Sequence, residues 1–487
     1  MGIKKISIHN FRGFSDGEIE LKPLTVLLGP NSAGKSSFGH ALAAMAHAHR
    51  LFSGTPQASL TPTLTVARTW PIDLGSLDDL RTNGASGPVK VGIETDSGLI
   101  EIGFGVDPLT SLLPSYFRFP KGEESGGSQT VSMVNPLDRT NTSPAGQTGT
   151  LGPKVIYESA EGSHYEVRRL NELQWEESGV PSTVILDGLS LKSITHERGT
   201  AILLSGKARK ELEFLFQNLS YLRATRHRPS RTYPAGSGIR PARKMSGADS
   251  PQEIGYAGER AAGVLHRRAG ESVQYAKLPN IPNTIEEARR QQGERASLVS
   301  GSLLAAVSAW LHRLELADSL RTDLSGDDTD RLEILVTLPG QSERNWVEIG
   351  FGTSQVVPIL TAGLLQGPGS VFIVDLPEAH LHPRPQADLA DFFCSLALSG
   401  RFSLVETHSE MFFHRLRLRA EMDDDLRDKI SVYFIDKPVD GLCCQPRRVG
   451  LGLDEQLRWP VGFLQEAWEA EGQIEAVRQS KKESTRK

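Results

Sequence analysis

The residue types best suited to chemistry lie in a short glycine-rich segment near the start of the sequence. Gly29 and Gly34 enclose four residues, and Lys35 and Ser36 follow directly. The apolar run Leu24–Leu28 precedes the segment and an alanine-rich run follows it, so the pattern predicts a strand, a loop and a helix. Backbone amides at such glycines converge on phosphate oxygens, and the helix start adds partial positive charge. The segment is a Walker A motif, in which Lys35 reaches the β- and γ-phosphates of a nucleotide and Ser36 binds Mg²⁺.

A carboxylate ends a second apolar run, at residues 370–374. Such a run is typical of a parallel strand buried on both faces, and Asp375 follows it. This is the Walker B arrangement, in which Asp375 holds Mg²⁺, mostly through water. Glu378 is the nearest carboxylate able to polarise an attacking water; helix capping or an ion pair is its alternative role. His380 and His382 resemble a metal pair, but no third ligand is apparent nearby, which favours a structural role.

Two polar segments near this acidic strand could bind further phosphate. Residues 350–355 combine a glycine-rich turn, a hydroxyl at Ser354 and the start of a predicted helix, which together make a second anion site. One chain needs only one phosphate cradle, so the γ-phosphate of a second subunit is expected to dock here; the alternative is an ordinary helix start with Ser354 as N-cap. His408 follows the apolar run Phe402–Glu406 at the carboxyl edge of the predicted sheet, where nucleotide chemistry takes place. Its imidazole could contact the γ-phosphate or be a hydrogen-bonded structural histidine.

The segment 221–244 is basic, with six arginines, one lysine and no acid. Three interpretations stay open. The segment could contact nucleotide phosphates, it could hold DNA, or it could be a solvated basic loop.

Length and composition bound the class of protein. The chain has 487 residues, 38% of them hydrophobic and 23% charged, and a net charge of −5, so any nucleic-acid surface must be a local patch. Three cysteines exclude a disulfide framework and a four-thiolate zinc site. No run approaches the ~20 apolar residues that span a bilayer, and no apolar signal core follows the N-terminal lysines. We therefore expect a soluble, cytoplasmic protein without a membrane partner.

The remaining pattern predicts the elements that position these residues. Short strands open the chain, core strands return from about residue 331, and their apolar runs imply a parallel sheet. Further expectations are a long flexible loop at 120–153, helices at about 207–219 and 284–320, a strand at 346–349 and a helix from about Ser354. The expected domains are residues 1–60 for the N-terminal strands and phosphate loop, 61–220 for a β-rich insertion, 221–330 for the basic segment and a helical lid, 331–469 for the rest of the ATPase core, and 470–487 for a charged, flexible tail.

Together these segments resemble the ABC-type ATPases of the RecF/SMC/OLD group, and within it the stand-alone bacterial ATPases of the AAA-15 kind. The likeness rests on residues 6–14, 24–37, 347–355, 377–383, 406–409 and 459–463, whereas residues 60–220 are poorly covered. It implies an α/β fold: an ABC-type ATPase head with a mostly parallel P-loop sheet, an N-terminal antiparallel β-lobe and a helical insertion or lid.

The resemblance also implies a mechanism. Two heads would bind two ATP molecules head-to-tail with Mg²⁺, each between Lys35 and Ser36 of one subunit and Ser354 of the other, so that ATP favours a homodimer. The implied nucleotide contacts are Gly29, Asn31, Gly34, Lys35, Ser36 and Ser37 in the loop, Gly352, Ser354 and Gln355 in the signature, and Arg226 in the basic segment. Asn31 is an extra donor in this arrangement, or only caps the turn.

Two departures from the family pattern matter. Many ABC-type ATPases carry an acidic general base directly after the Walker B carboxylate, and here that residue is Leu376. Glu378 is the replacement candidate, and slow hydrolysis is expected. OLD-type nucleases carry a metal-dependent TOPRIM domain after the ATPase, and too few residues follow His408 for one, so no nuclease activity is expected in this chain itself.

By resemblance, the biological role is control of a separate effector protein, such as a nuclease, in bacterial defence against phage. One alternative is a DNA-repair or chromosome-maintenance ATPase that binds DNA itself. The other is a nucleotide-gated scaffold that hardly hydrolyses ATP.

Overall fold

The computed structural model describes residues 3–52, 82, 89–107, 111–120, 128–134, 154–158, 164–167, 173–177, 180–187, 190–196, 201–202, 206–234, 251–291, 293–325, 328–436 and 444–451. The expected tail at 470–487 and the family segment at 459–463 lie outside these residues. Within them, no helix has the length and apolar character that crossing a bilayer requires.

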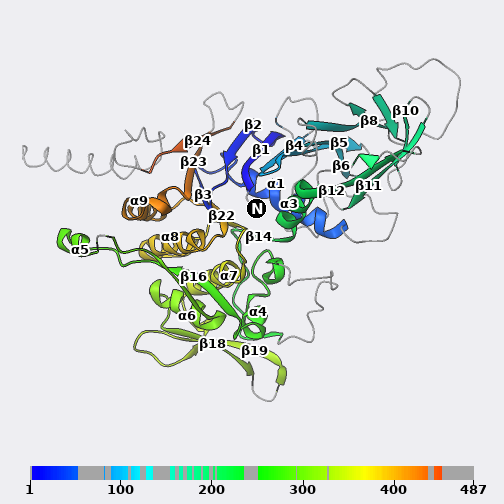
Figure 1. Cartoon of the computed structure of the whole chain (residues 1–487). Helices are drawn as coiled ribbons and strands as arrows, with labels where there is room; N and C mark the ends of the chain where they lie inside the picture. Colours follow the sequence, from blue (N-terminus) through cyan, green and yellow to red (C-terminus); the bar gives the residue numbers. More distant parts are fainter. Residues whose placement is uncertain are drawn as a thin grey trace, which may run out of the picture.

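A six-stranded sheet forms the centre of the fold (Figure 1). It combines a strand from residues 24–28 with strands that lie between residues 219 and 449. Its order is β14 (Leu219–Leu222), β21 (Val371–Asp375), β22 (Phe402–Glu406), β3 (Leu24–Leu28), β23 (Ile430–Asp436) and β24 (Gln445–Val449). Each neighbouring pair is parallel except β23 and β24, which are antiparallel. Strands β3 and β21 are buried along their whole length, as expected for a sheet covered on both faces. The predicted, mostly parallel P-loop sheet is confirmed.

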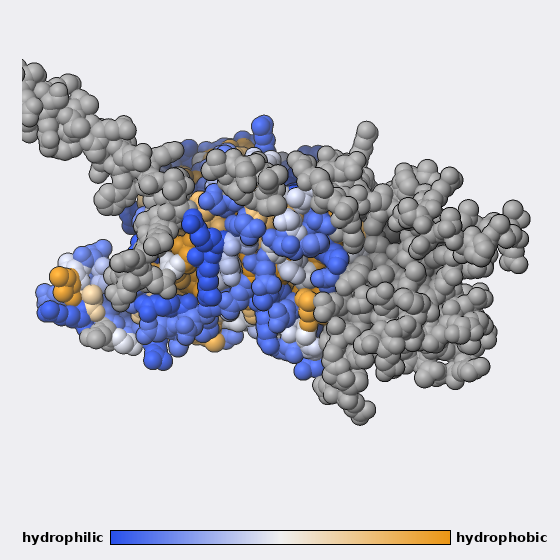
Figure 2. All heavy atoms as spheres, turned by 90° about the horizontal axis from the view of Figure 1, so that it is seen from above, coloured by the Kyte–Doolittle hydropathy of each residue, from blue (hydrophilic) through white to orange (hydrophobic). Residues whose placement is uncertain are grey.

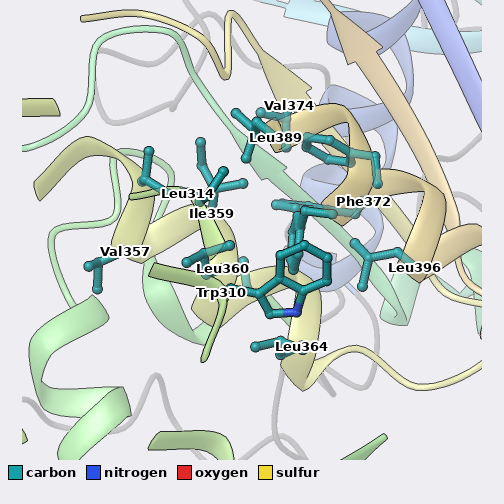
Figure 3. Packing of buried hydrophobic residues seen from close by; sticks show 14 of the residues in the cluster. Trp310, Leu314, Val357, Ile359, Leu360, Leu364, Phe372, Val374, Leu389 and Leu396 are labelled. Carbon is teal, nitrogen blue, oxygen red and sulfur yellow. The ribbon is translucent and has the colours of Figure 1, made fainter. Parts of the chain in front are cut away.

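Side chains of these strands alternate between two hydrophobic cores. Leu27, Ile373 and Leu404 face a core shared with α1 (Ser36–Phe52), α3 (Gly206–Gln217) and the N-terminal β-lobe. Their neighbours Val26, Phe372 and Val405 face the other core, which includes side chains of α7 (Phe351–Leu365), α8 (Pro383–Leu398) and α9 (Glu410–Met422). This alternation follows from the two-residue period of a strand. Part of the second core is shown in Figure 3, where Trp310 of α6 (Leu303–Arg313) packs with Leu360, Leu364, Phe372 and Leu396.

A second, antiparallel sheet forms the N-terminal β-lobe and continues into a long meander. Its order is β13 (Ala201–Ile202), β12 (Ser190–His196), β11 (Val180–Asp187), β10 (Leu173–Glu177), β9 (His164–Val167), β8 (Lys154–Glu158), β7 (Ser128–Val134), β6 (Ser111–Pro120), β5 (Gly98–Asp107), β4 (Val89–Thr95), β1 (Ile3–Phe11) and β2 (Phe14–Glu20). The expected antiparallel lobe is confirmed. The expectation of a continuous loop at 120–153 is wrong at β7, which pairs with both β6 and β8. The sparse apolar residues of β7 alternate with hydroxyl residues, and long-range pairing supports this weak local signal.

The segment between β14 and α7 contains η1 (Pro251–Ile254), α4 (Ala261–Arg267), α5 (Ile285–Arg290) and α6 (Leu303–Arg313). Its strands are the hairpin of β16 (Ser272–Lys277) and β17 (Ser297–Ser302), and a small sheet of β15 (Tyr233–Pro234), β18 (Ser319–Ser325), β19 (Asp328–Thr337) and β20 (Arg344–Asn345). Beyond the hairpin, α5 projects from the body as an arm (Figure 1), and apolar surface gathers at the tip (Figure 2), where Ile285 is 76% exposed. The short helix α10 (Asp424–Arg427) follows α9.

Three local expectations need correction. The helix expected at 284–320 is interrupted by β17, and strand β18 begins at Ser319. The strand expected at 346–349 is instead a turn of 3₁₀ helix, η2 (Trp346–Glu348), in which the Val347 amide donates to the side chain of the N-cap Asn345. Helix α7 begins at Phe351, three residues before Ser354. Side-chain capping and burial of Trp346 override the apolar pattern in this stretch.

Candidate nucleotide-binding site

The phosphate loop connects β3 to α1 at the carboxyl end of the central sheet. Gly29 has φ = +144°, and a Cβ there would lie 2.3 Å from the carbonyl oxygen of Ile435, so only glycine fits. Gly34 has φ = +92° and precedes the helix. Lys35 is buried, and its Nζ donates to the carbonyl of Pro30 at 2.7 Å, so the ammonium lies folded over the loop. Burial lowers the pKa of Lys35.

The remaining loop residues lie in two different environments. Asn31 is exposed at the top of the loop, where it is accessible to a ligand. Ser37 is buried, and its hydroxyl has no hydrogen-bond partner among the described residues. An unsatisfied hydroxyl beside the helix start is consistent with a site that binds a polar ligand.

Asp375 ends β21 and faces the start of α1 across a pocket of about 470 Å³, which Ser36, His40, Asp375 and Glu406 help to line. The hydroxyl of Tyr221, on the neighbouring strand β14, donates to Asp375 Oδ2 at 2.5 Å. The same hydroxyl lies 3.2 Å from His40 Nε2, one helical turn beyond Ser36. The two predicted Mg²⁺ ligands, Ser36 and Asp375, are therefore brought to one pocket. Tyr221 and His40 were not predicted, because their contribution depends on the strand order.

Glu406 is the second carboxylate of this pocket, and the sequence pattern gave it no role. It ends β22 directly opposite Asp375 in the parallel register. The Ser36 hydroxyl bonds to it, and Lys35 Nζ lies 3.9 Å from its Oε1. Burial and the neighbouring Asp375 raise the pKa of Glu406 to about 7, although Ser36 and Lys35 oppose this shift. The sequence signal available for Glu406 was its position directly before Thr407 and His408.

Glu378 and His408 are joined in one hydrogen-bonded turn. The backbone amide of His408 donates to Glu378 Oε1 at 2.8 Å, and the Thr407 hydroxyl also bonds to this carboxylate. Glu378 is buried, its Oε2 has no hydrogen-bond partner among the described residues, and burial raises its pKa. The His408 side chain is exposed and bonds to the backbone of Gly29; partial burial and Lys35 lower its pKa. His408 therefore borders the phosphate loop, and Glu378 is joined to it through the His408 amide.

Arg226 is buried behind the turn that follows Asp375, residues 376–380, called here the acidic turn. Its Nη2 donates to the carbonyls of Asp375 at 2.8 Å and Leu376 at 3.0 Å. Leu376 has φ = +44°, which is rare for a leucine, so the guanidinium stabilises a strained turn. Burial lowers the pKa of Arg226 to about 10, and the charge of Glu378 opposes this change. Of the three interpretations of the basic segment, none anticipated this internal role.

Phe351 and Gly352, at the start of the signature segment, pack against the acidic turn of the same chain. A Cβ at Gly352 would lie 2.8 Å from the His380 carbonyl, and the Phe351 ring meets the His380 ring edge-on at 4.8 Å. Ser354 is buried in the first turn of α7, and its hydroxyl donates to the Phe351 carbonyl at 2.7 Å. Gln355 is buried as well. Ser354 is thus not the N-cap, a position that Gly350 occupies.

The donor set suits a hard cation. Among the described residues, no group of three or more His, Cys, Asp and Glu side chains could hold a metal ion by itself. Mg²⁺ is bound in proteins by one or two carboxylates together with water and substrate phosphates. A hydroxyl at Ser36 and a carboxylate at Asp375 fit this pattern, whereas His380 and His382 lack a third ligand.

Comparisons with known proteins give two family matches. The model described as "AAA ATPase domain" matches residues 1–129, and the model described as "AAA domain, putative AbiEii toxin, Type IV TA system" matches residues 158–413, more than half of the chain. No curated protein matches the sequence.

Two solved structures illustrate the structural similarity. The SMC head domain from Thermotoga maritima has 11% identity and a TM-score of 0.36, covering 92% of this chain and 99% of that chain. The Smc head domain with an extended coiled coil bound to the C-terminal domain of ScpA, derived from Pyrococcus furiosus, has 13% identity and a TM-score of 0.37, covering 97% of this chain and 99% of that chain.

Proposed function

The chain belongs to the family described as "AAA domain, putative AbiEii toxin, Type IV TA system", and on this premise we propose that it binds Mg·ATP and slowly hydrolyses it to ADP and phosphate. The observation that carries the proposal is the meeting of the phosphate loop with Asp375, Glu378 and Glu406. These residues stand at or just beyond the carboxyl ends of three adjacent parallel strands, although more than 300 residues separate them from the loop along the chain.

Each residue has a distinct role in the proposed reaction. Lys35 leaves the Pro30 carbonyl and binds the β- and γ-phosphates, while the loop amides hold the phosphate oxygens. Ser36 and Asp375 would hold Mg²⁺, which would supply positive charge to those oxygens. Glu378 accepts the proton of the attacking water, and His408 contacts the γ-phosphate.

The hydrophobic Leu376 supports slow turnover. A carboxyl held by a backbone amide has one oxygen left for the attacking water. Leu376 stands in the position of the usual base and cannot accept a proton. We therefore propose that slow hydrolysis sets how long the ATP-bound state of the protein lasts.

Two variants test hydrolysis directly. Lys35→Ala should abolish ATP binding, whereas Lys210→Ala, an exposed lysine on α3, should leave it unchanged. Glu378→Gln should bind ATP and lower kcat by about a hundredfold or more, because a general base contributes this much. Normal ATP affinity in Lys35→Ala would refute nucleotide binding at this site, and unchanged hydrolysis in Glu378→Gln would leave the scaffold alternative.

We propose further that ATP joins two copies head-to-tail, with Gly352, Ser354 and Gln355 of one copy facing the phosphates bound by the other. In the single chain Gly352 packs against the His380 carbonyl, and Ser354 and Gln355 are buried in the first turn of α7. The nearby side chains of Val347 and Phe351 are 36% and 39% exposed. Native mass measurements should show a dimer of Glu378→Gln with Mg·ATP and a monomer with ADP. A monomer under both conditions would refute this arrangement.

The biological setting that we propose is bacterial anti-phage defence, in which the ATP state controls a separate effector such as a nuclease. Purification of the tagged chain from its own host, with ATP and Mg²⁺, should retain that partner for the wild type and lose it for Lys35→Ala. A bare homodimer would favour the alternative of a DNA-transaction ATPase.

The DNA alternative has less support in the described part of the basic segment. Arg226 is buried, and Arg231 pairs with Glu348 at 2.7 Å. Charge reversal at Arg223 and Arg228, which are exposed, is the appropriate test, since Arg226 cannot reach DNA in this fold. Loss of DNA binding in that double variant would support direct DNA contact.

A further inference from the structure

We propose that Glu406 is a ligand of the divalent cation and completes, with Ser36 and Asp375, a cation site that is formed before a nucleotide binds. This inference rests on the proposed function, because the cation is the one that accompanies ATP. It assigns a role to a carboxylate whose presence is not explained by the Walker motifs or by His408.

The sheet register places the two carboxylates side by side. Strands β21 and β22 are parallel neighbours, and Asp375 and Glu406 are direct partners at their ends. Neighbouring strands lie about 4.8 Å apart, and partners in register project from the same face of a sheet. Both side chains line one pocket with Ser36, which bonds to Glu406. A hydroxyl and two carboxylates therefore converge on one volume.

The charges around Glu406 leave it without a strong partner. Only 9% of the residue is exposed, and its Oε2 has no hydrogen-bond partner among the described residues. Lys35 is 3.9 Å from the other oxygen and is already bonded to Pro30. In the proposed reaction Lys35 moves to the phosphates, which would leave Glu406 facing Asp375 without the Lys35 ammonium. A buried, uncompensated carboxylate is costly, and a divalent cation between the two removes that cost.

The third carboxylate of the site is held differently. Glu378 accepts the His408 amide and has the Arg226 guanidinium as a counter-charge. It therefore has its own partners, whereas Glu406 and Asp375 share one side of the pocket. The contrast separates a carboxylate suited to water activation from one suited to cation binding.

Two other roles for Glu406 make different predictions. If it only holds Lys35 in place before nucleotide binding, its removal would free the ammonium and tighten ATP binding without changing cation affinity. If it only accepts the Ser36 hydrogen bond, its removal would alter stability and leave both affinities unchanged.

The decisive experiment measures Mn²⁺ binding to the full chain without nucleotide, by electron paramagnetic resonance of free Mn²⁺, with Mg²⁺ as competitor. The wild type should bind Mn²⁺ at a single site and release it to Mg²⁺. Glu406→Gln should weaken binding by about tenfold or more, as expected for loss of a metal-site partner. Glu406→Asp, which keeps a carboxylate on a shorter stem, should weaken it less, and it preserves the test if the glutamine variant does not fold.

Matched controls separate this inference from the proposed function. Glu286→Gln, on the exposed arm helix α5 with a side chain 75% exposed, should bind Mn²⁺ as the wild type does. Lys35→Ala should keep Mn²⁺ binding while it loses ATP binding. Absence of Mn²⁺ binding in the nucleotide-free wild type, or equal affinity in Glu406→Gln, would overturn the inference even if Mg·ATP binds normally. Failure of the wild type to bind ATP would instead overturn the proposed function.

Discussion

Replacing Tyr221 by phenylalanine tests whether neighbouring side chains hold the Asp375 carboxylate in position for Mg²⁺. The hydroxyl donates to Asp375 Oδ2 at 2.5 Å and lies 3.2 Å from His40 Nε2. Only 2% of Tyr221 is exposed, so its ring is part of the core. Phenylalanine keeps that ring and removes a single oxygen, and the change isolates the hydrogen bond.

The size of the effect follows from the charge and burial of the pair. A hydrogen bond to a charged group contributes about 1.5–3 kcal/mol. Burial and the adjacent Asp375 raise the pKa of Tyr221 far above its ordinary value, so the hydroxyl keeps its proton and remains a donor. We expect the free energy of unfolding to fall by about 2 kcal/mol at neutral pH. Because the carboxylate also loses its orienting partner, the Mg²⁺ concentration for half-maximal ATP hydrolysis should rise by about tenfold or more.

The assay combines urea unfolding in EDTA with a Mg²⁺ titration of ATP hydrolysis. Tyr433→Phe is the matched control, since Tyr433 is 7% exposed and its hydroxyl accepts from the backbone amide of Glu20 at 2.9 Å. The control should lose stability and keep the Mg²⁺ dependence of the wild type. The reasoning is refuted if Tyr221→Phe and Tyr433→Phe respond to Mg²⁺ in the same way.

Three further changes test other parts of the site. Arg226→Met should lower the free energy of unfolding by about 3–5 kcal/mol in urea titrations, because it removes the buried counter-charge of Glu378; a loss below about 1 kcal/mol would contradict the buried clamp. The raised pKa of Glu406, about 7, means that its contribution to stability is complete below pH ~4.5 and lost as the pH rises through 7. In EDTA, the Tm of the wild type should therefore fall relative to Glu406→Gln between pH 5 and 7.5, and parallel curves would contradict the shift. Gly29→Ala should lose ATP affinity measured by calorimetry, since its Cβ would collide with the Ile435 carbonyl; wild-type affinity would show that the loop adapts.

The elements predicted with greatest success were those with strong local periodicity. The expected runs at 370–374 and Phe402–Glu406 match β21 and β22 within a residue, because a parallel strand buried on both faces has a continuous apolar sequence. The helix expected at 207–219 corresponds to α3. In contrast, the weakly apolar strand β7 was missed, since hydrogen bonds to β6 and β8 supply what its sequence lacks.

The sequence by itself determined which residues could bind phosphate and Mg²⁺, because a glycine loop, a lysine, a hydroxyl and a strand-end carboxylate are defined by short-range spacing. Only the tertiary structure decided their partners. Tyr221 meets Asp375 across 154 positions of sequence, Arg226 turns inward onto the acidic turn, and Glu406 stands opposite Asp375. These relations depend on the order in which β14, β21, β22 and β3 pair. That order is set by packing between distant segments, and no local pattern encodes it.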